Sequence, residues 1–309
     1  MKEEPKSHFI KTPFGIPFSG WKTIILRLKD QLNRDNTSIV SAGVAFYSFL
    51  AIFPAIIALV SIYGLAVSPE QIESQLTRLS AMMPQQAFEI LKGRLENLLE
   101  TSGKTLGWGM IAGLLFSIWS ASRGTKSMFT GVNIAYDTGD NRSFLKQNAL
   151  TLVFTFGAII LVILSMALIV AFPSFIHRFG LPDNIEALFT WLRWVILGII
   201  LIFSISLLYK LAPARPNPKF RWIFFGAALS TVLWLLVSWA FSFYVKNFST
   251  YGEIYGSISA VVVLMLWLFI TSFIILLGAE LNSEIEKYTG NHWSIDQRED
   301  KSKSWLDDD

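Results

Sequence analysis

The chain contains no cysteine and only three histidines among its 309 residues. No disulfide, catalytic thiolate or cysteine-bound metal can therefore form within it. The three histidines, His8, His177 and His292, do not pair at metal-ligand spacing. Walker A and Gly-x-Ser-x-Gly motifs are also absent. The sequence thus predicts no catalytic residues, no metal, no cofactor and no enzyme activity.

Charge is scarce as well, because Asp, Glu, Lys and Arg make up 16% of the chain against about 25% in soluble domains. Six stretches contain none of these residues: 36–69, 105–122, 147–177, 194–209, 222–245 and 254–279. A helix needs roughly 20 apolar residues to cross a bilayer. These runs exclude an ordinary soluble domain, a disordered chain and a barrel of alternating strands.

What remains is an all-α, polytopic membrane protein with six transmembrane helices. We expect the spans near 40–66, 106–122, 149–172, 189–210, 222–245 and 256–280. Residues 1–38 then form an N-terminal segment, residues 39–282 the transmembrane domain and residues 283–309 a polar tail. The first apolar run starts near Ile39, after a charged, proline-containing segment, so the first span is expected to act as an uncleaved anchor.

The Lys and Arg residues predict the orientation. Of the 26, 19 lie in the N-terminal segment, the second–third loop, the fourth–fifth loop and the tail. Cytoplasmic loops carry an excess of these residues. Both termini are therefore expected to be cytoplasmic in a multi-pass protein of the inner (cytoplasmic) membrane.

Two segments outside the spans have helical patterns. Residues 19–34 predict an amphipathic helix, with Trp21, Ile24, Ile25, Leu28 and Leu32 on one side. This helix can lie in the membrane interface, pack under the bundle, or do both. Residues 68–103 predict an external helical hairpin that caps the bundle, gates an opening or binds a partner.

Polar residues at the edges of the spans are the candidate functional residues. Glu280 ends the sixth span and Arg123 ends the second, so both fall at the predicted cytoplasmic end and can pair. A structural ion pair or two exposed charges is the alternative. Asn133 and Tyr136 are expected in a cytoplasmic helix under the bundle. The remaining candidates are Asn282 and, in the external turn 247–257, Asn247, Tyr251, Glu253 and Tyr255.

That external turn either lines a cavity or forms a tight turn anchored by interfacial tyrosines. Pro54 should kink the first span, because proline removes a helix hydrogen bond. Two pairs of glycines, each with four-residue spacing, allow close helix approach, within the bundle or between two copies in a homo-oligomer. They are Gly103, Gly107, Gly109 and Gly113.

Several short motifs together resemble the YihY/BrkB family of bacterial inner-membrane proteins. In chain order they are Ala45-Phe46-Tyr47, Phe53-Pro54-Ala55, Trp119-Ser120-Ala121-Ser122-Arg123-Gly124, Asn133-Ile134-Ala135-Tyr136, Leu208-Tyr209-Lys210-Leu211-Ala212-Pro213, Tyr244-Val245-Lys246-Asn247-Phe248, Tyr255-Gly256-Ser257 and Gly278-Ala279-Glu280-Leu281-Asn282. The resemblance covers about residues 36–286. It implies a six-helix cytoplasmic-membrane protein, and it brings a virulence-factor label and an old ribonuclease BN label.

The resemblance assigns no catalytic residue. The basic residues follow the topology rule instead of forming a groove for RNA, so neither nuclease activity nor a nucleic-acid partner is expected. We expect a transporter or permeability protein for an ion, small solute or lipid. The alternative is a non-transporting envelope scaffold or assembly protein that acts through partners.

Overall fold

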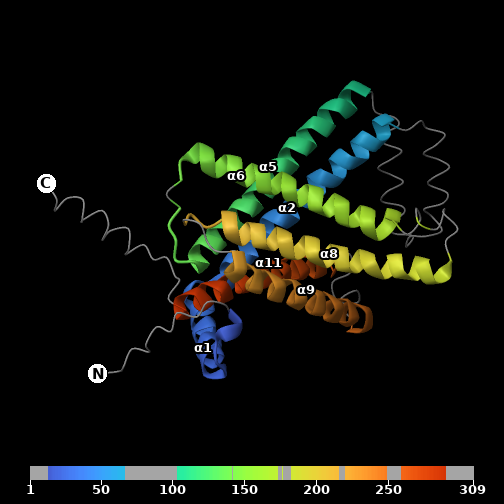
Figure 1. Cartoon of the computed structure of the whole chain (residues 1–309). Coiled ribbons are helices and arrows are strands. Elements are labelled where there is room, and N and C mark those ends of the chain that lie inside the picture. Colours follow the sequence, from blue (N-terminus) through green and yellow to red (C-terminus); the bar gives the residue numbers. More distant parts are fainter. Residues whose placement is uncertain are drawn as a thin grey trace. The chain divides into compact units, whose positions relative to one another are not determined.

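The computed structural model describes residues 13–66, 103–140, 142–172, 176, 182–215, 220–248 and 259–289. In this part of the chain all regular structure is helical, with no strand (Figure 1). The α-helices are α1 (Phe18–Arg34), α2 (Thr37–Ala66), α5 (Gly103–Ala135), α6 (Phe144–Met166), α8 (Asp183–Leu211), α9 (Phe220–Phe248) and α11 (Ser259–Tyr288). A short 3-10 helix, η1 (Pro13–Gly15), precedes α1, and a π-helical turn, η2 (Ala167–Ala171), follows α6.

Four of the described helices are long and apolar enough to cross a membrane. The candidate spans are Phe144–Ile169, Leu188–Leu211, Trp222–Val245 and Ala260–Tyr288, and Thr37–Ile52 is a shorter apolar helix. The all-α membrane class expected from the sequence is therefore confirmed. The sequence predicts six spans, two more than these four candidate helices, so the count of six remains a prediction.

Helix boundaries differ from the predicted spans in two places that matter for the site. The second predicted span and the cytoplasmic helix expected after it form one continuous helix, α5, which carries Asn133 and ends just before Tyr136. The sixth predicted span ends at Glu280, but α11 continues to Tyr288 and crosses the predicted boundary at 282–283. Charged residues follow Glu280 without ending the helix, because most of them are buried against neighbouring elements.

Two residues with positive φ end helices. Asp137, at φ 50°, ends α5, and the backbone N–H groups of Asp137 and Thr138 donate to the carbonyls of Ile134 and Asn133. This pattern is a Schellman motif, in which a left-handed residue satisfies the last carbonyls of a helix. Asn36, at φ 49°, separates α1 from α2. Asn and Asp tolerate this backbone region better than most residues.

The chain divides into two compact units. The first comprises Met1–Ala45 and Gly124–Asp309, and the second comprises Phe46–Arg123. In the second unit, the Ser117 hydroxyl donates to the Ala51 carbonyl at 3.4 Å, and the rings of Phe116 and Trp119 lie 5.4 Å apart. α2 runs as a helix through Pro54, and the expected kink there stays a prediction.

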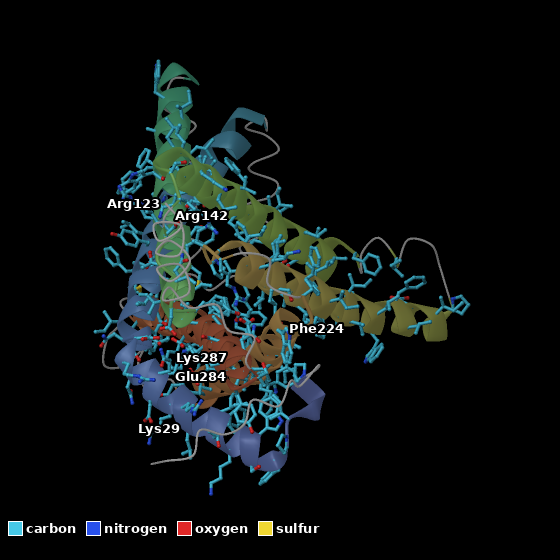
Figure 2. All side chains as sticks on the ribbon, turned by 60° about the vertical axis from the view of Figure 1, so that its left-hand side comes forward. Lys29, Arg123, Arg142, Phe224, Glu284 and Lys287 are labelled. Atoms are coloured by element: carbon cyan, nitrogen blue, oxygen red, sulfur yellow. The ribbon has the colours of Figure 1, made fainter. Side chains whose placement is uncertain are left out.

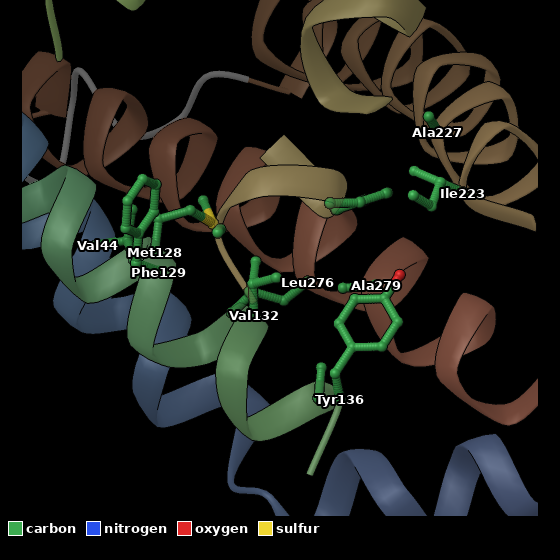
Figure 3. Close-up of a cluster of buried hydrophobic side chains, with 12 residues drawn as sticks. Val44, Met128, Phe129, Val132, Tyr136, Ile223, Ala227, Leu276 and Ala279 are labelled. Carbon is green, nitrogen blue, oxygen red and sulfur yellow. The ribbon is translucent and has the colours of Figure 1, made fainter. Parts of the chain in front are cut away.

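In the first unit, α9 packs along α11 and α8 packs along α9 (Figure 1). Residues from α2, α5, α8, α9 and α11 form one buried apolar cluster, which Figure 3 shows around Val132, Tyr136 and Leu276. A second cluster joins α1 to α9 and α11 through Ile24, Trp222 and Ile285. The predicted N-terminal helix is thus present as α1 and packs on the bundle.

Candidate functional site

A group of polar side chains gathers where several helices of the first unit end. The carboxyl ends of α5, α8 and α11 meet the amino ends of α2, α6 and α9 there, through the contacts described below. We call this group the polar end cluster. Its members are Thr37, Asn133, Tyr136, Asp137, Arg142, Arg215, Glu280, Asn282, Glu284, Glu286 and Lys287. Most of these side chains are buried.

Asn133 joins the end of α5 to the segment between α8 and α9. Its Nδ2 donates to the Phe129 carbonyl at 2.9 Å and to the Ala212 carbonyl at 3.4 Å. Its Oδ1 accepts from the Ala214 backbone N–H at 2.9 Å and from the Thr138 hydroxyl at 3.0 Å. The carboxamide uses both its donors and its acceptor within the protein, so it fixes the helix ends.

Arg142 reaches the same segment from the turn before α6. Its two terminal nitrogens donate to the carbonyls of Leu211, Ala212 and Pro213 at 2.9, 3.0 and 2.7 Å. The last carbonyls of a helix have no partner within the helix, and a planar guanidinium can satisfy several of them at once. Arg142 therefore caps the carboxyl end of α8.

Arg215 forms the centre of a second set of contacts. Its guanidinium pairs with the Glu286 carboxylate, and both side chains are 4% exposed. The same guanidinium lies 3.8 Å from the centroid of the Tyr136 ring. Burial raises the pKa of the Tyr136 hydroxyl above its ordinary value, although the nearby Arg215 charge acts in the opposite direction. Tyr136 therefore acts here as a neutral aromatic face for a buried cation.

Asn282 holds α9 against α11. Its Oδ1 accepts from the Gly226 backbone N–H at 2.8 Å, and its Nδ2 donates to the Ile223 carbonyl at 3.0 Å. A Cβ at residue 226 would overlap this carboxamide. One turn earlier on α11, a Cβ at Gly278 would overlap the hydroxyls of Ser230 and Tyr209. Both glycines thus allow α8, α9 and α11 to approach closely.

Lys287 makes two ionic contacts near the surface of the cluster. Its ammonium lies 2.8 Å from a carboxylate oxygen of Asp137 and 2.9 Å from one of Glu284. Figure 2 labels Lys287 and Glu284 beside each other on α11. These contacts join the left-handed residue after α5 to the last turns of α11, so the basic groups of the cluster are engaged internally.

Glu280 is the carboxyl group of the cluster for which the described residues provide no ion pair, whereas Asp137, Glu284 and Glu286 each contact a basic group. Its side chain is 1% exposed, and its Oε1 accepts one long hydrogen bond, from the Thr37 hydroxyl at 3.4 Å. Its Oε2 is buried without a hydrogen-bond partner in the described part of the chain. The Tyr136 hydroxyl and the Arg215 Nε also lack a hydrogen-bond partner in this part of the chain. Asp35 and Lys287 are its charged neighbours. The sequence singled out this carboxyl group, and the structure places it in the interior with one oxygen unsatisfied.

The structure brings together four of the predicted candidates, Asn133, Tyr136, Glu280 and Asn282, in one unit. Arg123 belongs to the other unit, where its guanidinium lies 5.4 Å from the centroid of the Trp119 ring. Its pairing with Glu280 stays a prediction. Asn247 lies in the last turn of α9. Tyr251, Glu253, Tyr255 and the external hairpin 68–103 fall outside the described residues, and the packing of Gly103, Gly107, Gly109 and Gly113 on α5 also stays a prediction.

Sequence reasoning missed Arg142, Arg215, Glu286 and the two close-contact glycines, Gly226 and Gly278. The charged residues were counted only for orientation, because their partners lie about 70 positions away in the chain. For Arg142 the sequence did contain a hint, because Arg142 and the carbonyls that it binds lie in two loops that are both predicted on the cytoplasmic side of the membrane. Within the described residues, no group of three His, Cys, Asp or Glu side chains is placed to hold a metal ion.

The described helices, four of them long and apolar enough to cross a bilayer, define the chain as an integral membrane protein. Residues 28–303 match the family model described as Virulence factor BrkB, and the chain belongs to that family. The resemblance inferred from its motifs is thereby confirmed.

The chain is similar to several bacterial proteins. It is 32% identical over 253 residues to the ribonuclease-like protein YfkH of Bacillus subtilis (strain 168). The matched region covers 80% of this chain and 89% of YfkH. A UPF0761 membrane protein of Idiomarina loihiensis is 24% identical over 260 residues, which cover 84% of this chain and 89% of that protein. A UPF0761 membrane protein of Xanthomonas campestris pv. campestris (strain B100) is 38% identical over 84 residues, which cover 27% of this chain and 20% of that protein. No solved structure matches the chain.

Proposed function

We propose that the protein moves an ion, a small solute or a lipid across the cytoplasmic membrane, and that Glu280 takes part in this transport. The observation that carries the proposal is the buried Glu280 carboxyl group, whose Oε2 has no hydrogen-bond partner in the described part of the chain. An ionisable group within a membrane helix is costly and is by default a functional candidate. A proton, a cation or a polar solute would satisfy the free oxygen.

The surroundings of Glu280 support this reading by contrast. Asn133, Arg142 and Asn282 bind backbone groups of other helices, and Arg215 pairs with Glu286. Those residues have structural partners and hold the helix ends in place. Glu280 has one long hydrogen bond, from Thr37, and its charged neighbours are the carboxylate of Asp35 and the ammonium of Lys287, with no ion pair in the described residues.

Six crossings, with the polar end cluster on the cytoplasmic side, form part of the proposal. The end of α5, the start of α6, the segment between α8 and α9 and the end of α11 meet in the cluster. The positive-charge rule assigns these same segments to the cytoplasm. In this proposal the chain leaves the cytoplasmic side in one helix of a pair and returns in the other. The three pairs are α2 with α5, α6 with α8 and α9 with α11, which gives six crossings.

Reconstitution tests the transport proposal. Purified protein would be placed in vesicles, and proton, K⁺ and Na⁺ flux and the flipping of a fluorescent phospholipid would each be measured. We expect at least one probe to move faster than in protein-free vesicles, and Glu280→Gln to abolish that flux. Asp30→Asn, which removes an exposed carboxylate from α1, is the matched control and should retain it. Vesicles as tight as protein-free ones to every probe would contradict the proposal.

A scaffold role is the second candidate, and one observation favours it. Asn133, Arg142, Arg215, Asn282 and Lys287 are each engaged with backbone or ionic partners. Such a network suits a rigid body that presents surfaces to partners. In that case, deleting residues 70–102 should remove the cellular phenotype and leave the bundle folded, while Glu280→Gln should have no effect.

We also propose that the chain is not a ribonuclease, although YfkH carries a ribonuclease-like name. Arg142 donates to three carbonyls, Arg215 pairs with Glu286, and Lys287 contacts two carboxylates. These basic groups are therefore not free to bind the phosphates of RNA. Incubation of the purified protein with end-labelled RNA should give no cleavage, and cleavage that survives repurification would contradict this.

A further inference from the structure

The helix α1 has one face packed on the bundle. Gly20 and Ile24 are buried, and Ile24 belongs to the apolar cluster with Trp222 and Ile285. The ring of Trp21 lies 5.3 Å from that of Phe225 on α9, and a Cβ at Gly20 would meet the Tyr288 side chain. This face packs against α9 and α11.

Large apolar side chains also lie on the outward face of α1. Phe18, Ile25 and Leu26 are 89%, 59% and 58% exposed. Lys22 and Lys29 are exposed too. At 3.6 residues per turn, Phe18, Lys22, Ile25 and Lys29 fall within an arc of about 60°. We call these four residues, with Leu26 at their edge, the α1 stripe.

The two lysines of the α1 stripe have no ionic partner in the described part of the chain. A water-facing helix normally carries polar side chains on such a face. Lysines set among apolar side chains instead suit the membrane interface, where the alkyl stems follow the apolar surface and the ammonium groups reach lipid phosphates. Figure 2 labels Lys29 on this helix.

The position of α1 in the chain fits that environment. Only Asp35 and Asn36 separate it from α2, an apolar helix that begins at Thr37. Ile39, in the first turn of α2, is 70% exposed, so an apolar surface begins directly after the turn. α1 therefore lies next to the start of the exposed apolar surface of α2, which is where contact with lipid would begin.

We propose that the α1 stripe binds the surface of a membrane that contains anionic lipid. Phe18, Ile25 and Leu26 enter the boundary between headgroups and acyl chains, and Lys22 and Lys29 bind the phosphates of anionic headgroups. Anionic lipid attracts clustered basic residues close to the membrane surface. The opposite face of α1 stays on α11, so the helix connects the bundle to the lipid surface. This interaction does not depend on whether the protein transports anything.

Spin labelling tests the proposal on the full chain, because the absence of cysteine allows single labels to be placed without removing any native thiol. Ile25→Cys and, as the control on the other side of α1, Arg27→Cys would be labelled in nanodiscs. One set would contain only phosphatidylcholine, and the other would also contain phosphatidylglycerol. We expect the label at residue 25 to be accessible to oxygen and protected from a water-soluble nickel reagent, most strongly with phosphatidylglycerol. The label at residue 27 should remain exposed to the nickel reagent.

Charge reversal in the same samples separates the lipid contribution. Lys22→Glu with Lys29→Glu should shift the residue-25 label toward water in phosphatidylglycerol discs only, and Lys22→Gln with Lys29→Gln serves if the first pair fails to fold. A residue-25 label as exposed to nickel as residue 27 would overturn the proposal. Protection from both reagents would show that protein covers the stripe and would overturn it too. Equal depth in both lipids would contradict the role of the lysines.

Discussion

The guanidinium of Arg215 and the carboxylate of Glu286 form an ion pair in which both side chains are 4% exposed. The pair joins the segment after α8 to the last turns of α11, and the Tyr136 ring covers the guanidinium from the end of α5. Taking two charges out of water is costly, so such a pair stabilises a fold only when its partners are correctly placed. The arrangement therefore fixes the relative positions of three helix ends.

Removing one partner of this pair should strongly destabilise the protein. Glu286→Ala leaves the Arg215 charge buried without its partner, and we expect a loss of about 3–5 kcal/mol in the free energy of unfolding. Asp137→Asn is the control, because Lys287 keeps its contact with Glu284. The contact between Lys287 and Asp137, which this control removes, is partly exposed to solvent, and such pairs typically contribute about 1 kcal/mol or less. Thermal unfolding followed by tryptophan fluorescence measures both, and equal losses would contradict the assignment.

Glycine substitutions test the close approach of α9 and α11. Gly226→Ala and Gly278→Ala insert a methyl group where Asn282, Ser230 and Tyr209 leave no room. Overpacking of this kind typically costs about 1–3 kcal/mol.

Gly157→Ala on α6 and Gly198→Ala on α8 are matched controls, because their added Cβ atoms meet nothing within 4 Å. Alanine is favoured over glycine inside a helix by about 1 kcal/mol, so these two variants should be neutral or more stable. The four midpoints of thermal unfolding give the comparison. No separation between the two pairs would mean that the helices are not packed as described.

Arg142→Lys tests the cap on α8. A lysine keeps the charge but cannot present a planar fork to the carbonyls of Leu211, Ala212 and Pro213. Charged hydrogen bonds of this type contribute about 1.5–3 kcal/mol each, and we expect a loss of that order. Hydrogen exchange should also become faster at the backbone amides of Leu211, Ala212, Ala214 and Arg215. Lys146→Arg, an exposed change in the first turn of α6, should affect neither quantity, and wild-type exchange in Arg142→Lys would rule out the cap.

Much of the architecture could be predicted from the sequence, for physical reasons. A helix in lipid must be apolar over its length, so α6, α8, α9 and α11 were visible as uncharged runs. The same constraint singled out Glu280 as an ionisable residue at the edge of a run. Asn133, Tyr136 and Asn282 were found through motifs, and the structure places all four in one cluster.

The pairwise contacts could not be predicted. Arg215 and Glu286 lie 71 positions apart, and nothing local distinguishes them from charges that face water. Gly226 and Gly278 look like ordinary glycines in apolar helices until the facing side chains are known. The polar segment after Leu281 was expected to be helical to about Tyr288, where α11 ends, but the burial of its charged residues could not be predicted.

The central claim is that Glu280 serves function and not stability. Its Oε2 has no partner among the described residues, so Glu280→Gln should leave the midpoint of thermal unfolding unchanged or raise it. The most direct measurement is therefore the flux of whichever probe the wild-type protein transports in vesicles, taken together with that midpoint for Glu280→Gln. We predict that flux falls to the level of protein-free vesicles while the midpoint is retained. Wild-type flux in Glu280→Gln, or loss of flux only together with loss of folding, would contradict the account.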